Sequence, residues 1–388
     1  MNILLSLLFI SLSFIIIWRS SHGFEVASDF LGRRLPPGIK GATINAIASS
    51  MPEFLTTIFF LFYLRDADGF SGGLGVTSGS ALFNLLIIPA LVVLMLVSID
   101  KGRKIRLNKQ VLLREGLVLL LAQILFVIFL FNAELRAQHG VWLVLLYMAY
   151  LLLLFLITRK KGSRTDPGFE SPVAGPPQSW LIRLLSVNIT HLVLNGRSLS
   201  PKRAWILLGG STVVMTMGTW LLVVGTDMFG DATRIPLIFV AVVLSAIATS
   251  VPDTIISIKD ARKGNYDDAV SNALGSNIFD IAFALGLPIL LYNLINGESI
   301  TLPPEIQAFT QEVWVFLLFS TVLALVILLA GKHFTRTKAW ILLGIYAIFL
   351  LFVGTQIQSG LSVTDESIGK PIGEFLTRIA DWLGERIY

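Results

Sequence analysis

The chain alternates between long apolar runs and short polar connections. A transmembrane helix requires about 20 consecutive, mainly apolar residues, and ten runs reach or approach this length. They cover residues 3–31, 38–64, 74–98, 111–132, 140–158, 203–231, 236–260, 268–294, 312–330 and 338–357. We therefore expect an all-α integral membrane fold of ten transmembrane helices, five before and five after a polar central segment.

The central segment, residues 160–202, opens with K-K-G-S-R-T-D-P-G-F-E-S-P-V-A-G-P-P-Q-S. Such a polar stretch, rich in Pro and Gly, is typical of a linker. We expect residues 1–159 to form a first transmembrane repeat and residues 203–388 a second repeat with a C-terminal tail. The later part of the linker, Trp180 to Leu194, is amphipathic and is expected to lie on the membrane surface.

The first apolar run resembles a signal peptide only in its position. Met1–Trp18 contains no basic residue, and no small-residue cleavage site closes the run. We interpret it as the first half of a long helix whose amphipathic second half ends at Leu31.

Composition supports the membrane interpretation. Hydrophobic residues make up 54% of the chain and charged residues only 14%, whereas soluble domains are about 25% charged. The absence of cysteine excludes disulfides, thiolate metal sites and Cys nucleophiles. The histidines are too scattered for a metal-binding spacing: His22, His139, His191 and His333. No resident cofactor and no enzymatic activity are expected.

The net charge of +5 reflects topology rather than nucleic-acid binding. By our count 23 Lys and Arg lie on the side that contains the linker and 6 on the other side. This bias places the linker in the cytoplasm and both termini outside, in a plasma or inner membrane. Five helices per half is an odd number, so the second half enters the membrane in the opposite sense. The two halves are therefore predicted to be inverted repeats.

A short motif occurs in both halves. Residues 44–58 read I-N-A-I-A-S-S-M-P-E-F-L-T-T-I, and residues 244–258 read L-S-A-I-A-T-S-V-P-D-T-I-I-S-I. Glu53 matches Asp253, and each acid lies within an apolar span. A carboxylate near the bilayer centre costs roughly 2.5–3.5 kcal/mol on insertion scales and needs a cation, a proton or a partner. Two matched acids in inverted repeats indicate one cation site built from two halves.

The residues around each acid favour the same interpretation. Pro52 and Pro252 lack an amide hydrogen and crowd the carbonyl four residues earlier. Carbonyls freed in this way at membrane depth line a cavity or hold an ion. With hydroxyl and carboxylate oxygens they form the ligand set of hard cations. A Pro-kinked helix whose Ser and Thr bond their own backbone is the alternative, but two matched copies favour the ion site. The small and hydroxylic residues concerned are Ala46, Ser49, Ser50, Ala246, Thr249 and Ser250.

A second matched pair follows each motif. Residues 79–85 read G-S-A-L-F-N-L and residues 275–281 read G-S-N-I-F-D-I. Ser80 and Asn84 are four residues apart and share one helix face, as do Ser276 and Asp280. The glycines permit close helix packing, but packing does not account for Asp280 within an apolar run.

The two pairs of motifs together resemble the α-repeats of the cation/calcium exchanger superfamily. The patterns concerned are A-x-x-S-S-x-P-E in the first half and A-x-x-T-S-x-P-D in the second, each followed by G-S-x-x-F-N/D. The resemblance is close over residues 38–90 and 236–290. A Ca2+/H+ exchanger would be expected to carry G-N-A-x-E in place of S-x-P-E. Asp253, Asp280 and the L-G-L-P run at 285–288 are similar to the potassium-dependent sodium/calcium branch. One departure is Ala48 and Ala248, where the family usually has Gly.

The resemblance implies a ligand assignment. Glu53 and Asp253 would hold Ca2+ with the carbonyls of Ser49 and Thr249. One flanking Na+ site would combine the Ala46 carbonyl, Ser49, Glu53 and Ser80. Its mirror image would combine the Ala246 carbonyl, Thr249, Asp253 and Ser276. Asn84 and Asp280 would complete the middle of the site. The linker is too short for a large calcium-sensing domain.

The function predicted is secondary antiport of Ca2+ against Na+ by alternating access, with K+ or a proton at Asp280 as open alternatives. Two carboxylates are neutralised by one Ca2+ or by two Na+, so shared ligands make the two loads exclude each other. If the protein switched between its two open states with an empty site, the buried charges would be uncompensated, at a free-energy cost of about 3 kcal/mol per charge. The expected partners are small inorganic cations and the lipid bilayer, with no nucleic acid and no obligate protein partner.

Three other functions were weighed. The first is a Ca2+/H+ or other divalent cation antiporter. The second is a cation channel, which would need a symmetric pore, and no filter repeat is present. The third is an intramembrane aspartyl protease using Glu53 with Asp253 or Asp280, but its Y-D and G-x-G-D signatures are missing.

Overall fold

The computed structural model describes residues 3–33, 35, 39, 41–64, 67–100, 105–132, 134–161, 188–194, 197–361 and 378. Within these residues, nine helices are long and apolar enough to cross a membrane. A tenth span is formed by the pair Ala42–Ser49 and Met51–Phe62, which is bent by 45°. The prediction of an all-helical fold with ten spans is confirmed.

The elements of the first half follow the predicted order. They are α1 (Ile3–Leu31), η1 (Gly41–Asn45), α2 (Ala46–Ser49), α3 (Met51–Phe62), α4 (Ala67–Leu82), η2 (Phe83–Ile87), α5 (Ile88–Ile99), α6 (Lys109–Leu130), β1 (Glu134–Leu135) and α7 (Ala137–Lys161). The third span begins at Ala67 rather than at residue 74. Its polar, Gly-rich first turns pack inside the protein, where Gly72 and Gly73 lie against Phe60 and Thr57.

The second half repeats this series. After the short α9 (Ile189–Leu194) come α10 (Pro201–Thr233), α11 (Leu237–Val240), η3 (Ala241–Ser245), α12 (Ala246–Thr249), α13 (Val251–Arg262), α14 (Tyr266–Phe279), η4 (Asp280–Leu285), α15 (Gly286–Asn296), β2 (Ile300–Thr301), α16 (Pro304–Leu329) and α17 (Arg336–Leu361). The ninth span begins at Pro304, eight residues before the apolar run, because its polar first turns are also helical.

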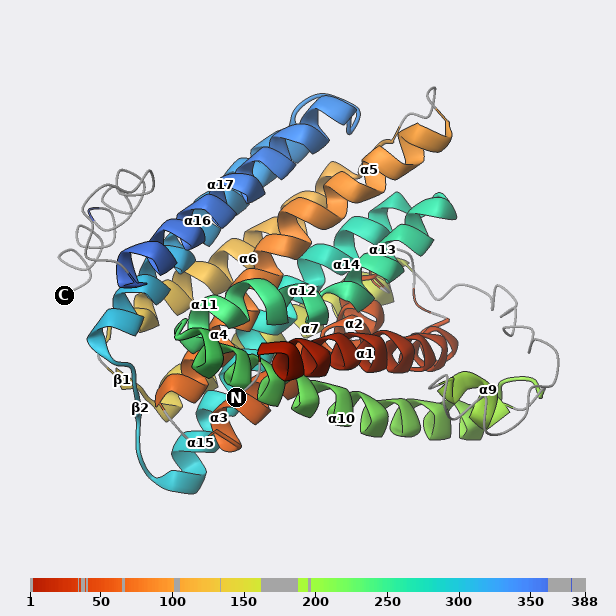
Figure 1. Ribbon diagram of the computed structural model, residues 1–388. Helices are drawn as coiled ribbons and strands as arrows, with labels where there is room; N and C mark the ends of the chain where they lie inside the picture. The colour runs from red at the N-terminus through yellow and green to blue at the C-terminus, as the bar shows by residue number, and fades with distance from the viewer. Residues whose placement is uncertain are drawn as a thin grey trace.

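Helices of the two halves are interleaved in one bundle (Figure 1), and their contacts are reciprocal. The fifth helix of each half packs on the third span of the other, so α7 contacts α15 and α17 contacts α5. Likewise η1 contacts α14 and η3 contacts α4. Each half therefore completes the packing of the other, as two inverted repeats about a pseudo-two-fold axis require.

Glycines allow the closest of these approaches. A Cβ added to Gly79 would lie 2.7 Å from Cβ of Ala246, and one added to Gly275 would lie 2.9 Å from Cα of Ala42. Any side chain at either position would collide with the opposite repeat. The predicted packing role of Gly79 and Gly275 agrees with this geometry.

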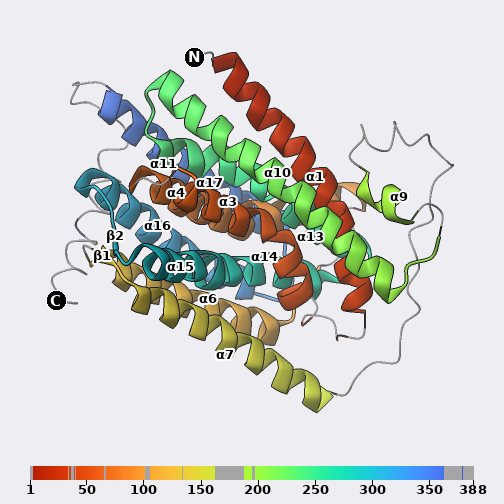
Figure 2. The same ribbon diagram turned by 90° about the horizontal axis from the view of Figure 1, so that it is seen from below.

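Helices α1 and α10 form an antiparallel pair along one edge of the bundle (Figure 2). Small residues recur every seven positions on both facing surfaces. On α1 they are Ser6, Ser13, Ser20 and Ala27, and on α10 they are Ala204, Ser211, Gly218 and Gly225; all are buried. The hydroxyls of these three serines of α1 donate to backbone carbonyls of their own helix. The two rows of small residues, here called the seam, therefore allow the helices to pack closely.

Short backbone pairings join the connections. β1 pairs antiparallel with β2, and Ile105 forms a bridge with Phe334. In the predicted linker, α9 packs on the α1–α10 pair through Ile189 and Leu194. The rest of the Trp180–Leu194 segment, up to Ser186 and Val187, lies outside the described residues, as does most of the linker.

Candidate cation site

Each acid-bearing span is interrupted just before its acid. Ser50 ends α2 with φ −90° and ψ 4°, and Ser250 ends α12 with φ −77° and ψ −1°. A proline then occupies the first turn of α3 and of α13, together with Glu53 or Asp253. Both carboxylates thus lie at helix N-termini, whose backbone amides favour negative charge. The bend exceeds 40° only in the first half.

π-helical turns flank the breaks. η1 and η3 directly precede α2 and α12, whereas Asn84 lies within η2 and Asp280 begins η4. A π-turn widens the helix and is frequently found at functional sites. In this chain the four π-segments are related by the repeat, so the distortion is a property of both halves.

All twelve residues predicted for the site are fully buried, with exposed fractions of 0%. They are Ala46, Ser49, Ser50, Glu53, Ser80, Asn84, Ala246, Thr249, Ser250, Asp253, Ser276 and Asp280. They come from the four central spans, and hydrogen bonds join the two halves. The Ala46 and Ala246 carbonyls each accept from the amide four residues later, that of Ser50 or Ser250, at 3.0 Å.

Glu53 is only partly satisfied. The Ser80 hydroxyl donates to its Oε1 at 3.0 Å, and Ser250 in turn donates to Ser80 at 2.9 Å. The Thr249 hydroxyl also faces this carboxylate. Within the described part of the chain, the second oxygen, Oε2, has no hydrogen-bond partner. Glu53 therefore has a free oxygen available to a cation.

Asp253, in contrast, accepts from three side chains. Ser276 donates to Oδ1 at 2.6 Å, Asn272 donates to the same oxygen at 3.3 Å, and Asn84 donates to Oδ2 at 2.9 Å. Asn84 comes from the other half, so the two repeats meet at this carboxylate. The three donors hold this carboxylate in one orientation.

The hydroxyl of Ser49, in the first half, contacts side chains of the second half. It lies 3.3 Å from Oγ of Ser276 and 3.3 Å from Oδ1 of Asn272. The family pattern led us to expect Ser49 beside Glu53 and Ser80. The hydrogen bonds instead place it with the donors of Asp253, because each break lies against the third span of the opposite repeat.

Asp280 has no hydrogen-bond partner on either oxygen among the described residues. It is close enough to Glu53 and Asp253 for electrostatic interaction, and the Ser50 hydroxyl faces it. The Ser50 hydroxyl and the Asn84 Oδ1 also lack partners in the described structure. A buried oxygen without a partner is costly, so this cluster is built for a group that binds from outside.

A hard cation fits that description. Such ions take carboxylate, hydroxyl, amide and carbonyl oxygens, which are the groups assembled here. Among the described residues no three carboxylate or histidine side chains form one metal-binding cluster. A bound cation would therefore draw several of its ligands from neutral oxygens.

Asn272 is a residue that the sequence comparison missed. It is fully buried and contacts Asp253, Ser257 and Ser49. The matching position in the first half is Val76, so a search for duplicated polar residues passes over it. A polar residue within the apolar span 268–294 was the available signal.

The profile of the family described as "Sodium/calcium exchanger protein" matches residues 5–156 and 203–355, which is most of both halves. The chain belongs to the sodium/calcium exchanger family. It is accordingly a transporter rather than an enzyme, as predicted.

Relatives of known name support this membership. The exchanger is 28% identical to the inner membrane protein YrbG of Escherichia coli over 75% of this chain and 78% of that protein. It is 25% identical to human sodium/potassium/calcium exchanger 5 over 87% of this chain and 78% of the human one.

Solved structures share the fold. A H+/Ca2+ exchanger, CAX, superposes with a TM-score of 0.69 at 13% identity, covering 98% of this chain and 87% of that one. The sodium-calcium exchanger NCX_Mj superposes with a TM-score of 0.56 at 22% identity, covering 89% and 97%. The inverted-repeat architecture is therefore that of membrane cation exchangers.

Proposed function

We propose that this exchanger moves Ca2+ in one direction across the membrane against Na+ in the other. Cation exchange follows from the family, and the choice of ions is our proposal. The observation that carries it is the pair of fully buried carboxylates, Glu53 and Asp253, at matched breaks in the two repeats. When both are ionised, their combined negative charge balances the positive charge of one Ca2+ or of two Na+.

In this proposal Ca2+ binds between Glu53 and Asp253, and the hydroxyls around them serve Na+. Ser80 is already on Glu53 and Ser276 on Asp253, so each carboxylate has a neutral oxygen beside it. Both loads use the same carboxylates and exclude each other. An empty site carries uncompensated buried charge, which opposes crossing without a load and makes the exchange obligatory.

Na+ is favoured over H+ as the driving ion by the S-M-P-E and S-V-P-D motifs. One of the relatives that match over most of this chain, the human protein, is named a sodium/potassium/calcium exchanger. Asp280, whose two oxygens have no hydrogen-bond partner in the described part of the chain, is the candidate for K+ or for a proton.

We further propose that residues 1–159 and 203–388 are the two transmembrane repeats and that residues 160–202 form a cytoplasmic linker, with both termini outside. The Lys and Arg bias supports this orientation. An inner membrane location is supported by the relative that carries that name.

The test is 45Ca2+ uptake by proteoliposomes under imposed Na+, K+ and H+ gradients, applied one at a time. The proposal requires uptake driven by an outward Na+ gradient. Uptake without any counter-ion would indicate a channel, and uptake driven only by H+ would replace Na+ as the driving ion. Liposomes without protein provide the background flux.

A further inference from the structure

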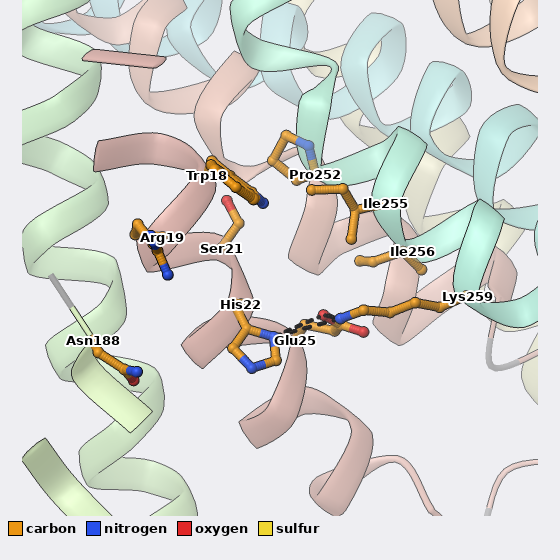
Figure 3. A pocket seen from close by; sticks show the side chains of 10 residues that line it. All are labelled: Trp18, Arg19, Ser21, His22, Glu25, Asn188, Pro252, Ile255, Ile256 and Lys259. Atoms are coloured by element: carbon orange, nitrogen blue, oxygen red, sulfur yellow. Dashed lines mark hydrogen bonds and ion pairs between the residues drawn. The ribbon is translucent and has the colours of Figure 1, made fainter. Parts of the chain in front are cut away.

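A pocket of about 370 Å3 lies between α1 and α13 (Figure 3), and none of the twelve candidate cation-site residues lines it. Trp18, Arg19 and His22 line it from α1, and Lys259 lines it from α13. Asn188, just before α9, lines it from the other side. The cation site does not use any of these residues.

The charges in this pocket do not suit a cation. Its charged lining residues are Arg19, Lys259 and Glu25, with His22 as a further titratable group. Glu25 reaches across to Lys259, with Oε2 and Nζ 2.6 Å apart, and His22 Nδ1 lies 3.4 Å from the same oxygen. Glu25 is thereby neutralised by Lys259, which leaves the charge of Arg19 uncompensated.

Arg19 is available to a ligand. Its guanidinium lies over the Trp18 ring, 5.1 Å from the centroid, and among the described residues it has no carboxylate partner. Its side chain is exposed. An arginine that has no carboxylate partner on a membrane helix can pair with a phosphate or another anion.

An apolar stripe on α1 leads to this arginine. Its members are spaced by three or four residues, share one helix face and are exposed: Leu4, Leu8, Leu12, Ile15 and Trp18. Beyond Trp18 the face becomes basic at Arg19 and His22. Tryptophan and arginine at the end of a lipid-facing stripe are typical of the level of the lipid headgroups.

We propose that this pocket binds an anionic phospholipid. The headgroup phosphate pairs with Arg19 and His22, and an acyl chain lies along Leu12 and Leu8. Basic pockets between transmembrane helices have this chemistry. Pro252, next to Asp253, also lines the pocket, so the lipid braces α1 against the helix that carries one of the two site carboxylates.

The experiment uses the purified full-length protein in detergent, without any transport assay. Dioleoyl phosphatidylglycerol and dioleoyl phosphatidylcholine are added separately, and thermal unfolding and the lipids retained in native mass spectrometry are recorded. Phosphatidylglycerol should raise the unfolding temperature more and be retained in preference. Arg19→Gln should weaken its retention about fivefold, as expected for roughly 1 kcal/mol per basic residue.

Arg197→Gln, at an exposed arginine outside the pocket, is the matched control and should retain the preference for phosphatidylglycerol. Arg19→Lys keeps the charge and should keep most of it, which guards against a general folding defect. The proposal is overturned if Arg19→Gln binds phosphatidylglycerol as well as wild type does. It is equally overturned if inorganic phosphate alone reproduces the stabilisation, because the site would then bind small anions rather than lipid.

Discussion

The amide of Asn272 donates to Oδ1 of Asp253 at 3.3 Å and to Oγ of Ser257 at 3.2 Å. At the position that matches Asn272, the first repeat has Val76. Asp253 accepts from three side chains, whereas one oxygen of Glu53 has no hydrogen-bond partner among the described residues. The asymmetry suggests that Asp253 is a fixed ligand and that Glu53 is the one that rearranges between ions.

Replacing Asn272 by Val should make the second repeat resemble the first. A hydrogen bond to a charged group contributes about 1.5–3 kcal/mol, so the Ca2+ concentration for half-maximal exchange should rise about tenfold or more. The measurement is 45Ca2+ exchange over a range of Ca2+ concentrations. Asn293→Val is the control, because the side chain of this asparagine donates only to backbone carbonyls among the described residues. Equal losses in both variants would argue against a role in ion binding.

Glu53→Gln and Asp253→Asn should each abolish Ca2+ exchange while the protein remains folded and inserted in the membrane. Each change removes a charge and almost no volume, so the site can no longer balance Ca2+. Flux in proteoliposomes and size-exclusion profiles are the two readouts. Near-normal Ca2+ flux in either variant would remove the central assignment.

Alanine at Ser49, Ser80, Thr249 or Ser276 should affect Na+ more than Ca2+. Each hydroxyl supplies a neutral oxygen, whereas Ca2+ depends mainly on the two carboxylates. The Na+ concentration for half-maximal exchange should increase severalfold, with a smaller change for Ca2+. If both ions are affected equally, the hydroxyls support the fold rather than separate Na+ sites.

Asp280 decides between K+ and a proton. With Glu53 and Asp253 balancing Ca2+, an ionised Asp280 leaves the loaded site one charge too negative. If K+ compensates, Ca2+ flux should rise with K+, and Asp280→Asn should make the flux independent of K+. If a proton compensates, flux should ignore K+ and fall as pH rises. A flux that responds to neither would show that this charge balance is wrong.

Ala48 and Ala248 should limit the speed of exchange. Ala48 packs with Phe24 and Met215, and Ala248 packs with Ile17 and Leu222. Both methyl groups thus touch the α1–α10 pair. Glycine at both positions should increase turnover, at a cost of about 1 kcal/mol in stability for each.

Ala122→Gly, at a buried position of α6, is the matched control for this pair. It should lower stability similarly without increasing turnover. Faster exchange in the control would mean that general loosening, and not contact with α1 and α10, sets the rate.

The transmembrane spans were largely predictable because the thickness of the bilayer fixes their length. The grouping of the candidate site residues was also largely predictable, because their motif is duplicated in the two halves. The twelve candidate residues are all buried in the four central spans. Periodicity did not indicate the helical turns at Ala67 and Pro304, because polar and Gly-rich turns inside a protein resemble loops. Asn272 has no duplicate, and the position of Ser49 beside Ser276 depends on how the repeats cross. Neither feature is encoded in a local pattern.

The seam between α1 and α10 repeats every seven residues, so the next equivalent alignment of the two helices is about 10 Å away at 1.5 Å per residue. A smaller slip would press large side chains onto Gly218 and Gly225, whose surroundings are already tight. We therefore expect α1 and α10 to move together as one rigid body. Because they move together, a displacement that uncovers the site toward one face covers it toward the other. Mutually exclusive openings would then follow from geometry, in addition to the charge barrier that we propose for an empty crossing.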